Sequence, residues 1–150
     1  MHDKDWMEEA YLLAKKSFAI GEVPVGSVII NDEGKLVGCG FNQMVTNHDP
    51  TAHAEIAAIR QAAQKVQNYR LEGATLYTTL EPCCMCAGAI VHSRIKRLIF
   101  ATRDLKSGAA GSVYNLMGGF PLNHKVQIDE GILQEKSAKL LEDFFRIRRI

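Results

Sequence analysis

Two short motifs contain the residues of this chain that are best suited to chemistry. One is His53-Ala54-Glu55, and the other is Pro82-Cys83-Cys84-Met85-Cys86, at the start of a predicted helix. Cys83 and Cys86 are three positions apart, so a helix places both sulfurs on one face. The free N–H groups and the positive dipole end at a helix N-terminus favour thiolate over thiol. Thiolate is the form of cysteine that binds zinc.

Two cysteines alone do not complete a zinc site, because structural zinc usually has four protein ligands. The sequence offers no second close pair of Cys or His, and Cys39 lies in a predicted strand. His53, 30 residues before Cys83, is a candidate third ligand. A fourth position left to water is typical of catalytic zinc, which lowers the pKa of that water towards about 7. Cys84, between the two candidate ligands, is expected to be a small buried side chain.

Glu55 is the candidate for proton transfer. It follows His53 by two residues, and at the first turn of a helix both side chains can point into one pocket. A carboxylate beside an activated water molecule can accept a proton and pass it on. The order H-x-E followed by P-C-x-x-C is the signature of the zinc deaminases, in which this glutamate is not a ligand. The alternatives are a purely structural zinc, or buried cysteines with a surface histidine.

The hydrophobic pattern predicts the elements that must position these motifs. Helices are predicted over residues 5–20, 52–65, 82–91 and 132–148, and strands over 25–31, 36–41, 74–80, 97–101 and 125–129. This order favours an α/β fold, a three-layer α/β/α sandwich around one central sheet. The first two strands form an antiparallel hairpin, whereas strands joined through helices are parallel, so the sheet is mixed. Residues 102–124 form a long glycine-rich loop.

Composition places the chain among ordinary globular proteins. Its 150 residues are 47% hydrophobic and 23% charged, with a formal net charge of +1. These values exclude a disordered chain, a collagen and a coiled-coil rod, and they favour a single domain over residues 1–150. The net charge gives no sign of nucleic-acid binding. The first 16 residues lack the apolar region of a signal peptide, and no apolar run is long enough to span a membrane. We therefore expect a cytoplasmic protein without a membrane partner, in which the thiols stay reduced.

Longer segments carry a resemblance to a known family. They are GEVPVG at 21–26, NHDPTAHAE at 47–55, EPCCMCAGAI at 81–90, DLKSGAAGS at 104–112, NH at 123–124 and FFRIRR at 144–149. With them the whole chain resembles the bacterial tRNA-specific adenosine deaminases, a branch of the cytidine deaminase-like superfamily. The zinc motifs alone fit cytosine, guanine and deoxycytidylate deaminases equally well. The long loop and the Phe-Phe-Arg ending favour the tRNA branch.

The resemblance implies a cytidine deaminase-like fold with a five-stranded sheet, whose last two strands are parallel, and a homodimer. It implies one Zn²⁺ per chain and hydrolysis of adenosine to inosine at the wobble position of an arginine tRNA, with the anticodon stem-loop as partner. It makes Glu55 catalytic, and His53, Cys83 and Cys86 the zinc ligands. The resemblance assigns substrate contacts to the base-pocket residues Asn42, Ala54 (through its N–H) and Val28 (as an apolar wall), to the loop residues Asp104, Lys106 and Asn123, and to Phe144, Phe145, Arg148 and Arg149 of the last helix.

Other interpretations remain open at this point. A small-molecule nucleobase deaminase acting on guanine or cytosine would share every catalytic residue. A non-catalytic RNA-binding protein could retain zinc for structure, although it would have no use for Glu55. On the last helix, Phe144 and Phe145 point about 100° apart, so one is expected in the core while the other can stack on a base.

Overall fold

Five strands form one mixed sheet at the centre of the fold. The computed structural model describes residues 1–118 and 124–148. The strand order is β2-β1-β3-β4-β5, and the strands are β1 (Gly26–Ile30), β2 (Leu36–Phe41), β3 (Thr75–Leu80), β4 (Arg97–Thr102) and β5 (Gln127–Glu130). β1 pairs antiparallel with both β2 and β3, whereas β3–β4 and β4–β5 are parallel. The predicted mixed sheet and the parallel last pair are both confirmed.

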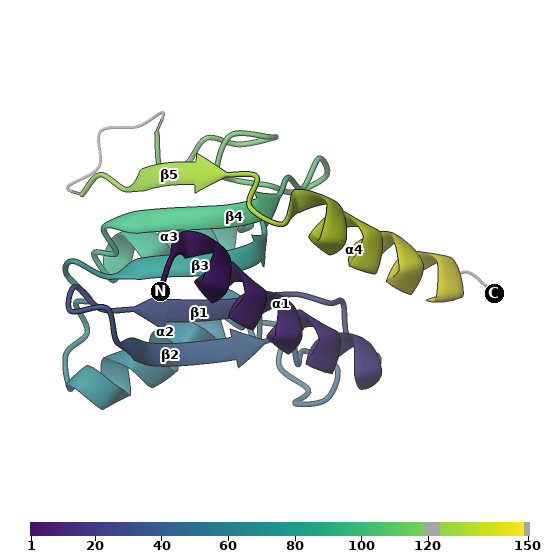
Figure 1. Cartoon of the computed structure of the whole chain (residues 1–150), viewed down its shortest axis with the longest axis horizontal. Coiled ribbons are helices and arrows are strands. Elements are labelled where there is room, and N and C mark those ends of the chain that lie inside the picture. Colours follow the sequence, from purple (N-terminus) through teal and green to yellow (C-terminus); the bar gives the residue numbers. More distant parts are fainter. Residues whose placement is uncertain (119–123, 149–150) are drawn as a thin grey trace.

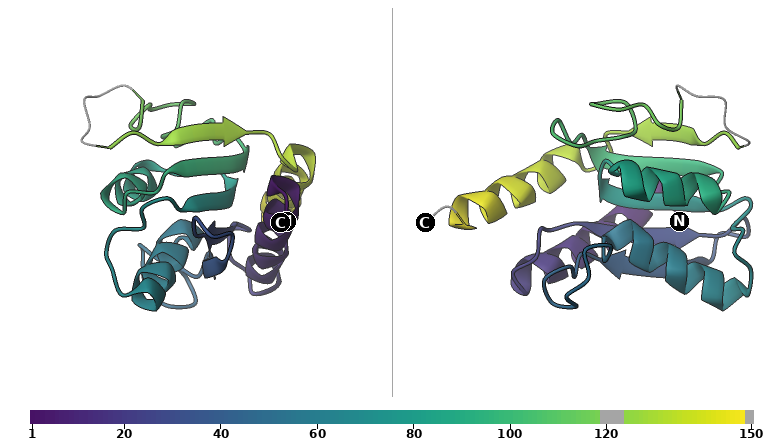
Figure 2. Two further views of the ribbon diagram at one scale, coloured as in Figure 1. Left: turned by 60° about the vertical axis from the view of Figure 1, so that its left-hand side comes forward. Right: turned by 180° about the vertical axis from the view of Figure 1, so that it is seen from behind.

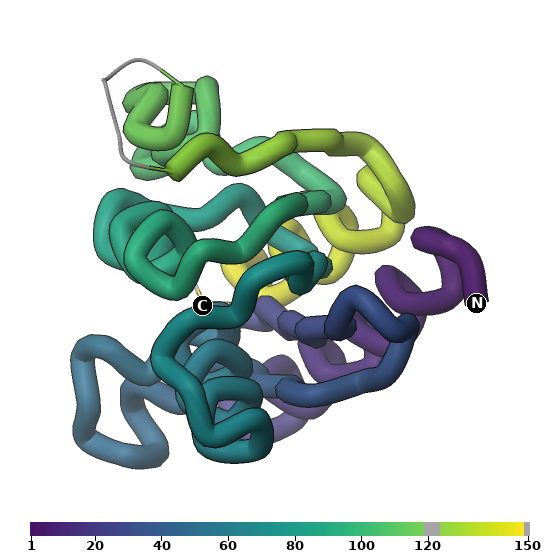
Figure 3. The backbone as a smooth tube through the Cα atoms, turned by 90° about the vertical axis from the view of Figure 1, so that its left-hand side faces the viewer, coloured from purple at the N-terminus to yellow at the C-terminus, as the bar shows by residue number. Residues whose placement is uncertain are grey.

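Helices cover both faces of this sheet (Figure 1). They are α1 (Asp3–Ala19), α2 (Ala54–Val66), α3 (Cys84–His92) and α4 (Gln134–Arg148). Figure 2 shows α2 and α3 on one face and α1 and α4 on the other, and the end-on view of Figure 3 separates α3 from α1 in the same way. Each layer has its own apolar core. Ile29, Leu76 and Leu98 belong to the core with α2 and α3, whereas Val28 and Tyr77 belong to the core with α1.

Close packing of α2 on β2 depends on two glycines in the strand. A Cβ at Gly38 would lie 2.4 Å from the carbonyl oxygen of Ala58, and one at Gly40 would lie 2.6 Å from that of Ala54. Both distances are far below van der Waals contact, so only glycine allows the helix to approach this closely. The first turn of α2, which follows His53, is therefore held directly against the sheet.

A network of charged and polar side chains ties the first turn of α1 to the sheet. Arg97 donates to both carboxylate oxygens of Asp3, at 3.0 and 2.9 Å, and Tyr77 donates its hydroxyl to Asp3 at 2.6 Å. Arg97 also donates to Asp129 on β5 at 3.0 Å. The hydrogen bond from Arg97 is the main cause that lowers the pKa of Asp3 below its ordinary value. The network fixes α1 and β5 at the end of the sheet where β4 begins.

Several predicted boundaries shift by one or two residues. α2 begins at Ala54 with His53 as its N-cap, and α3 begins at Cys84 with Cys83 as its N-cap. α4 begins at Gln134, because Gly131 and Leu133 before it have positive φ values of 106° and 58°. No helix in the described part of the chain is both long enough and apolar enough to cross a membrane.

Candidate active site

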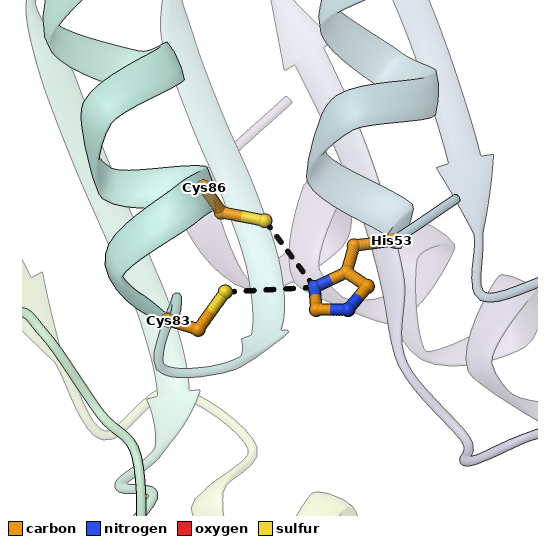
Figure 4. Close-up of side chains that lie close together, drawn as sticks. All are labelled: His53, Cys83 and Cys86. Atoms are coloured by element: carbon orange, nitrogen blue, oxygen red, sulfur yellow. Dashed lines mark hydrogen bonds between the residues drawn. The ribbon is translucent and has the colours of Figure 1, made fainter. Parts of the chain in front are cut away.

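The N-termini of α2 and α3 bring the three predicted ligands together. His53 precedes the first residue of α2, and Cys83 and Cys86 lie at the start of α3. Figure 4 shows the imidazole pointing across to both sulfurs. The Nδ1 atom of His53 lies 3.6 Å from Cys83 Sγ and 3.5 Å from Cys86 Sγ. Among the described residues, these three form the one Cys/His/acid group with its ligand atoms within 4.8 Å of one another.

The distances between these atoms fit a zinc ion. Zinc binds histidine nitrogen at about 2.0–2.1 Å and thiolate sulfur at about 2.3 Å with tetrahedral angles, which puts the nitrogen and each sulfur about 3.6 Å apart. The observed separations of 3.6 and 3.5 Å agree with that value. The donor set of one imidazole and two sulfurs suits zinc as well, and it leaves one tetrahedral position without a protein ligand. His53, Cys83 and Cys86 can therefore hold a zinc ion.

The two cysteines of the cluster differ in their tendency to ionise. The hydrogen bond from the Cys86 thiol is the main cause that lowers the pKa of Cys83 to about 4. The hydrogen bond that the Cys86 thiol donates to Cys83, together with burial, raises the pKa of Cys86. The hydrogen bond to Cys83 also raises the pKa of His53. Cys83 is thus favoured as a thiolate, and a divalent cation would supply the positive charge that stabilises the thiolate of Cys86.

Glu55 lies beside this cluster in the first turn of α2 and is 4% exposed. Burial is the main cause that raises the pKa of its carboxyl group to about 7, because the charged form loses its hydration. A carboxyl group with a pKa near neutrality can both accept and donate a proton at physiological pH. Glu55 therefore has the environment that general acid–base chemistry requires.

A small cavity of about 170 Å³ adjoins the cluster. Its apolar walls come from Val23, Val25 and Leu80, and Met44 also reaches it. The complete lining consists of Val23, Val25, Asn42, Met44, His53, Glu55, Leu80, Glu81, Cys83, Asp104 and Ser107. The cavity therefore opens onto two of the candidate ligands, His53 and Cys83, and onto Glu55.

The expectation that Val28 forms an apolar wall of this cavity is wrong. Val28 is 1% exposed and packs in the α1 core with Met7 and Tyr77. Successive side chains of a strand point to opposite faces, and the cavity lies on the α2/α3 side. The apolar wall is formed instead by Val23 and by Val25, which lies just before β1.

Asn42 and the N–H group of Ala54 meet at the wall of the cavity. The side-chain oxygen of Asn42 accepts a hydrogen bond from Ala54 N at 2.8 Å, and its amide nitrogen donates to Val23 O at 3.0 Å. Both groups are expected from the family resemblance to contact the base, and here they bind each other. Asn42 thereby links the start of α2 to the segment that forms the apolar wall.

Comparison with known proteins defines the family. Residues 1–102 match the family model described as the cytidine and deoxycytidylate deaminase zinc-binding region. The chain is 48% identical over 147 residues to the tRNA-specific adenosine deaminase of Haemophilus influenzae, covering 98% of this chain and 85% of that protein. It is 41% identical to the tRNA-specific adenosine deaminase of Bacillus subtilis, covering 96% and 89%. The chain belongs to the tRNA-specific adenosine deaminase family.

Solved structures of two kinds of deaminase share the fold of this family member. A structure from a study of A-to-I editing by tRNA:A34 deaminases at the wobble position superposes with a TM-score of 0.87. It is 38% identical in sequence and covers 91% of this chain and 98% of its own. A guanine deaminase from Nitrosomonas europaea superposes with a TM-score of 0.84 at 25% identity, covering 95% and 84%. The predicted cytidine deaminase-like fold is confirmed.

The long loop contributes two residues to the cavity, Asp104 and Ser107. Asp104 accepts hydrogen bonds from the backbone N–H groups of Lys106 and Ser107, at 3.0 and 3.1 Å. Lys106 is exposed beside them. Asn123, expected as a further RNA contact, lies outside the described residues.

The two phenylalanines of α4 point apart, as their spacing predicts, and the substrate contact expected for Phe144 does not fit its burial in the core. Phe144 is buried and meets Phe18 edge-to-face with ring centroids 5.9 Å apart, whereas Phe145 is 46% exposed. Phe145 lines a second cavity of about 470 Å³, which shares Val23, Leu80, Asp104 and Ser107 with the first. Arg148 donates to the carbonyl oxygen of Gly21 and lies 5.1 Å from the Phe144 ring. Arg149 lies outside the described residues.

The sequence interpretation missed some residues of the site and misjudged Cys84. Leu80, Met44 and Ser107 line the cavity without having been singled out. Leu80 could have been found, because it ends a predicted strand three residues before Cys83. Cys84 was expected to be buried, but it is exposed, because at the first position of α3 it points away from the two cysteines that face His53.

Proposed function

We propose that this chain is a zinc-dependent deaminase that converts adenosine to inosine at the wobble position of tRNA. The observation that carries the proposal is the His53–Cys83–Cys86 cluster with buried Glu55 beside it, at the edge of a cavity. Identity of 41–48% over nearly the whole chain to tRNA-specific adenosine deaminases supports the choice of substrate. An arginine tRNA is the substrate we expect.

Each residue of the cluster has a role in this proposal. His53 Nδ1 and the sulfurs of Cys83 and Cys86 hold one zinc ion per chain. When bound, zinc supplies the Lewis acidity that makes water a nucleophile at neutral pH. The carboxylate of Glu55 accepts the proton that the water loses as its oxygen bonds to C6 of adenine. Glu55 passes this proton to the ring nitrogen. It then accepts the second proton, from the hydroxyl that now sits on C6, and gives it to the amino group, which leaves as ammonia when its bond to C6 breaks and the C6 carbonyl forms.

The cavity receives the base after it leaves the stack of the anticodon loop. Val23, Val25 and Leu80 contact its faces, and Asn42 lies where it can bind its polar edge. The Ala54 N–H, which donates to Asn42 Oδ1, reaches the base only if that hydrogen bond opens. A base that is already unpaired in a loop is extruded at lower cost than one in a duplex. The reaction therefore suits a single-stranded part of the tRNA.

The surface beside the cavity is the place for the neighbouring nucleotides of the anticodon stem-loop. Exposed Phe145 offers a ring on which a base can stack. Asp104 and Lys106 flank the same cavity, and Arg148, with Arg149 and Asn123, completes the set of RNA contacts that we propose. Binding through such cations weakens as salt rises.

We also propose that the enzyme is a cytoplasmic homodimer. α3 contains no Asp, Glu, Lys or Arg, and it exposes Cys84 and Met85. A Cβ at Gly88 on this helix would meet nothing within 4 Å, which leaves room for a second backbone. A dimer through α3 would cover this uncharged face. In analytical ultracentrifugation we expect the wild type to sediment as a dimer and the Gly88→Trp variant as a monomer. The four free cysteines suit a reducing compartment such as the cytoplasm.

The experiment that tests the proposed function compares substrates in one assay. Purified zinc-loaded protein is incubated with an anticodon stem-loop that carries adenosine at the wobble position, and separately with free guanine and free cytosine. We expect inosine in the RNA and no ammonia from either base. Guanine deamination is the second candidate, favoured by the TM-score of 0.84 to a guanine deaminase. Turnover of a free base without turnover of the RNA would overturn the tRNA assignment.

A further inference from the structure

Glu81 is a buried acidic residue of the cavity lining that the proposed chemistry does not use. It lies directly before Pro82 and Cys83 in the sequence, and it is 2% exposed. In the part of the chain that the structure describes, no nitrogen of Lys, Arg or His lies within 4.0 Å of its carboxylate. A buried carboxylate is costly unless hydrogen bonds replace its hydration. Its partners therefore indicate what it does.

Among the described residues, the donors to this carboxylate all come from the loop over residues 104–112. One carboxylate oxygen accepts from Asp104 N at 3.1 Å. The other accepts from Ala110 N at 2.9 Å and from Ser112 N at 3.1 Å. The Ser112 hydroxyl donates to the first oxygen as well. The Glu81 carboxylate thus binds both ends of this loop, at Asp104 and at Ala110 and Ser112.

The main chain next to Glu81 reinforces this connection. Glu81 N donates to Thr102 O at 2.9 Å, and Ala109 N donates to Pro82 O at 2.8 Å. The loop is therefore bonded to the two residues that directly precede Cys83. Asp104 and Ser107, which line the cavity, lie within the segment that these bonds hold.

Gly108 lets the loop close over the carboxylate. A Cβ at this position would lie 2.4 Å from the Glu81 carboxyl carbon and 2.5 Å from Asp104 O. The carboxylate and the backbone of the loop are therefore in direct contact, with no space for a methyl group between them. The loop and Glu81 fit each other as a pair.

We infer that Glu81 is a positioning residue, which holds Asp104 and Ser107 at a fixed distance from the metal-binding motif. A carboxylate suits this role because it is acceptor-only and binds several N–H groups at once, with stronger bonds than a neutral acceptor. A glutamine would turn its NH₂ group towards some of these donors. The wall of the substrate cavity would then lose its attachment while the three candidate ligands keep theirs. The inference rests on the proposed function.

The test compares Glu81→Gln with the wild type in three measurements. We expect kcat/KM on the anticodon stem-loop to fall about 10- to 100-fold, since misplacement of binding groups by about 1 Å can have that effect. Zinc content should stay at the wild-type value. Hydrogen exchange at the amides of residues 104–112 should accelerate, and this readout does not depend on activity.

Two control variants separate positioning from general destabilisation. Tyr77→Phe removes a hydrogen bond in the network at the start of β4, so it should lower Tm without changing KM or loop exchange. Gly108→Ala keeps the carboxylate and displaces the same loop, so it should repeat the kinetic defect of Glu81→Gln with zinc retained. It also tests the inference if Glu81→Gln does not fold.

Loop exchange equal to wild type, or kcat/KM within twofold of wild type in Glu81→Gln and Gly108→Ala, would overturn the positioning role. Loss of zinc from Glu81→Gln would overturn it too, because Glu81 would then support the metal motif itself. If the wild type does not deaminate the RNA, the proposed function fails, and loop exchange alone still decides the role of Glu81.

Discussion

Replacing Gly40 with alanine should displace the start of α2 and with it His53 and Glu55. The new Cβ would lie 2.6 Å from Ala54 O and 2.7 Å from Ala57 Cβ. Carbon atoms pack at about 3.5–4.0 Å, so the helix must retreat by about 0.8 Å or more. Overpacking of this kind costs about 1–3 kcal/mol of stability. A displacement of about 1 Å at reacting groups can cost about 10²-fold in rate.

The matched control is Gly38→Ala on the same face of the same strand. Its Cβ would lie 2.4 Å from Ala58 O, farther along α2 from His53. Both variants should unfold at lower urea concentration than the wild type. Gly40→Ala should lose far more deaminase activity and zinc affinity than Gly38→Ala, measured by kcat on the stem-loop and by competition with a chelator. Equal activity losses in the two variants, or wild-type activity in Gly40→Ala, would refute this reasoning.

Three further predictions concern single side chains. Cys83→Ser should lose zinc and lower Tm together, because a metal that binds only the folded state adds to folding free energy; metal analysis and calorimetry check this. Glu55→Gln should keep zinc yet lower kcat by about 10²- to 10⁴-fold, measured as inosine formation. Asp3→Asn should destabilise the protein at pH 7, and its difference from the wild type should shrink as the pH falls below 3.8, as followed by urea unfolding. The Arg97 hydrogen bond lowers the pKa of Asp3 below its ordinary value of 3.8, so this stabilisation exists above the unfolded pKa and disappears as pH falls through the folded pKa.

The sequence was sufficient for the order of elements and for the three converging side chains. Each of these depends on local signals, such as hydrophobic periodicity, Pro82 before a helix, and the three-residue spacing of Cys83 and Cys86. It was not sufficient for the direction of Val28. Every residue of β1 is buried, so the strand has no polar face to show which side chains point to α1 and which to α2.

The conformation of the long loop was beyond sequence reasoning for a different reason. Residues 102–124 carry no periodic pattern, and the loop is held at Asp104, Ala110 and Ser112 by Glu81, 23 to 31 residues earlier in the chain. Hydrogen bonds over such separations leave no local signal. Helix caps were misplaced on a smaller scale, because Pro82 precedes the N-cap residue Cys83 and does not take the first helical position that its φ angle favours.

The most direct test of the central claim is to map inosine in a full-length arginine tRNA after incubation with the zinc-loaded protein. Nuclease fragments analysed by mass spectrometry locate every adenosine that has gained the mass of inosine. The expected result is inosine at the first anticodon position alone, formed by the wild type and not by Glu55→Gln. An unmodified wobble adenosine after incubation with a zinc-replete wild type, or equal inosine formation by Glu55→Gln, would contradict the proposed reaction.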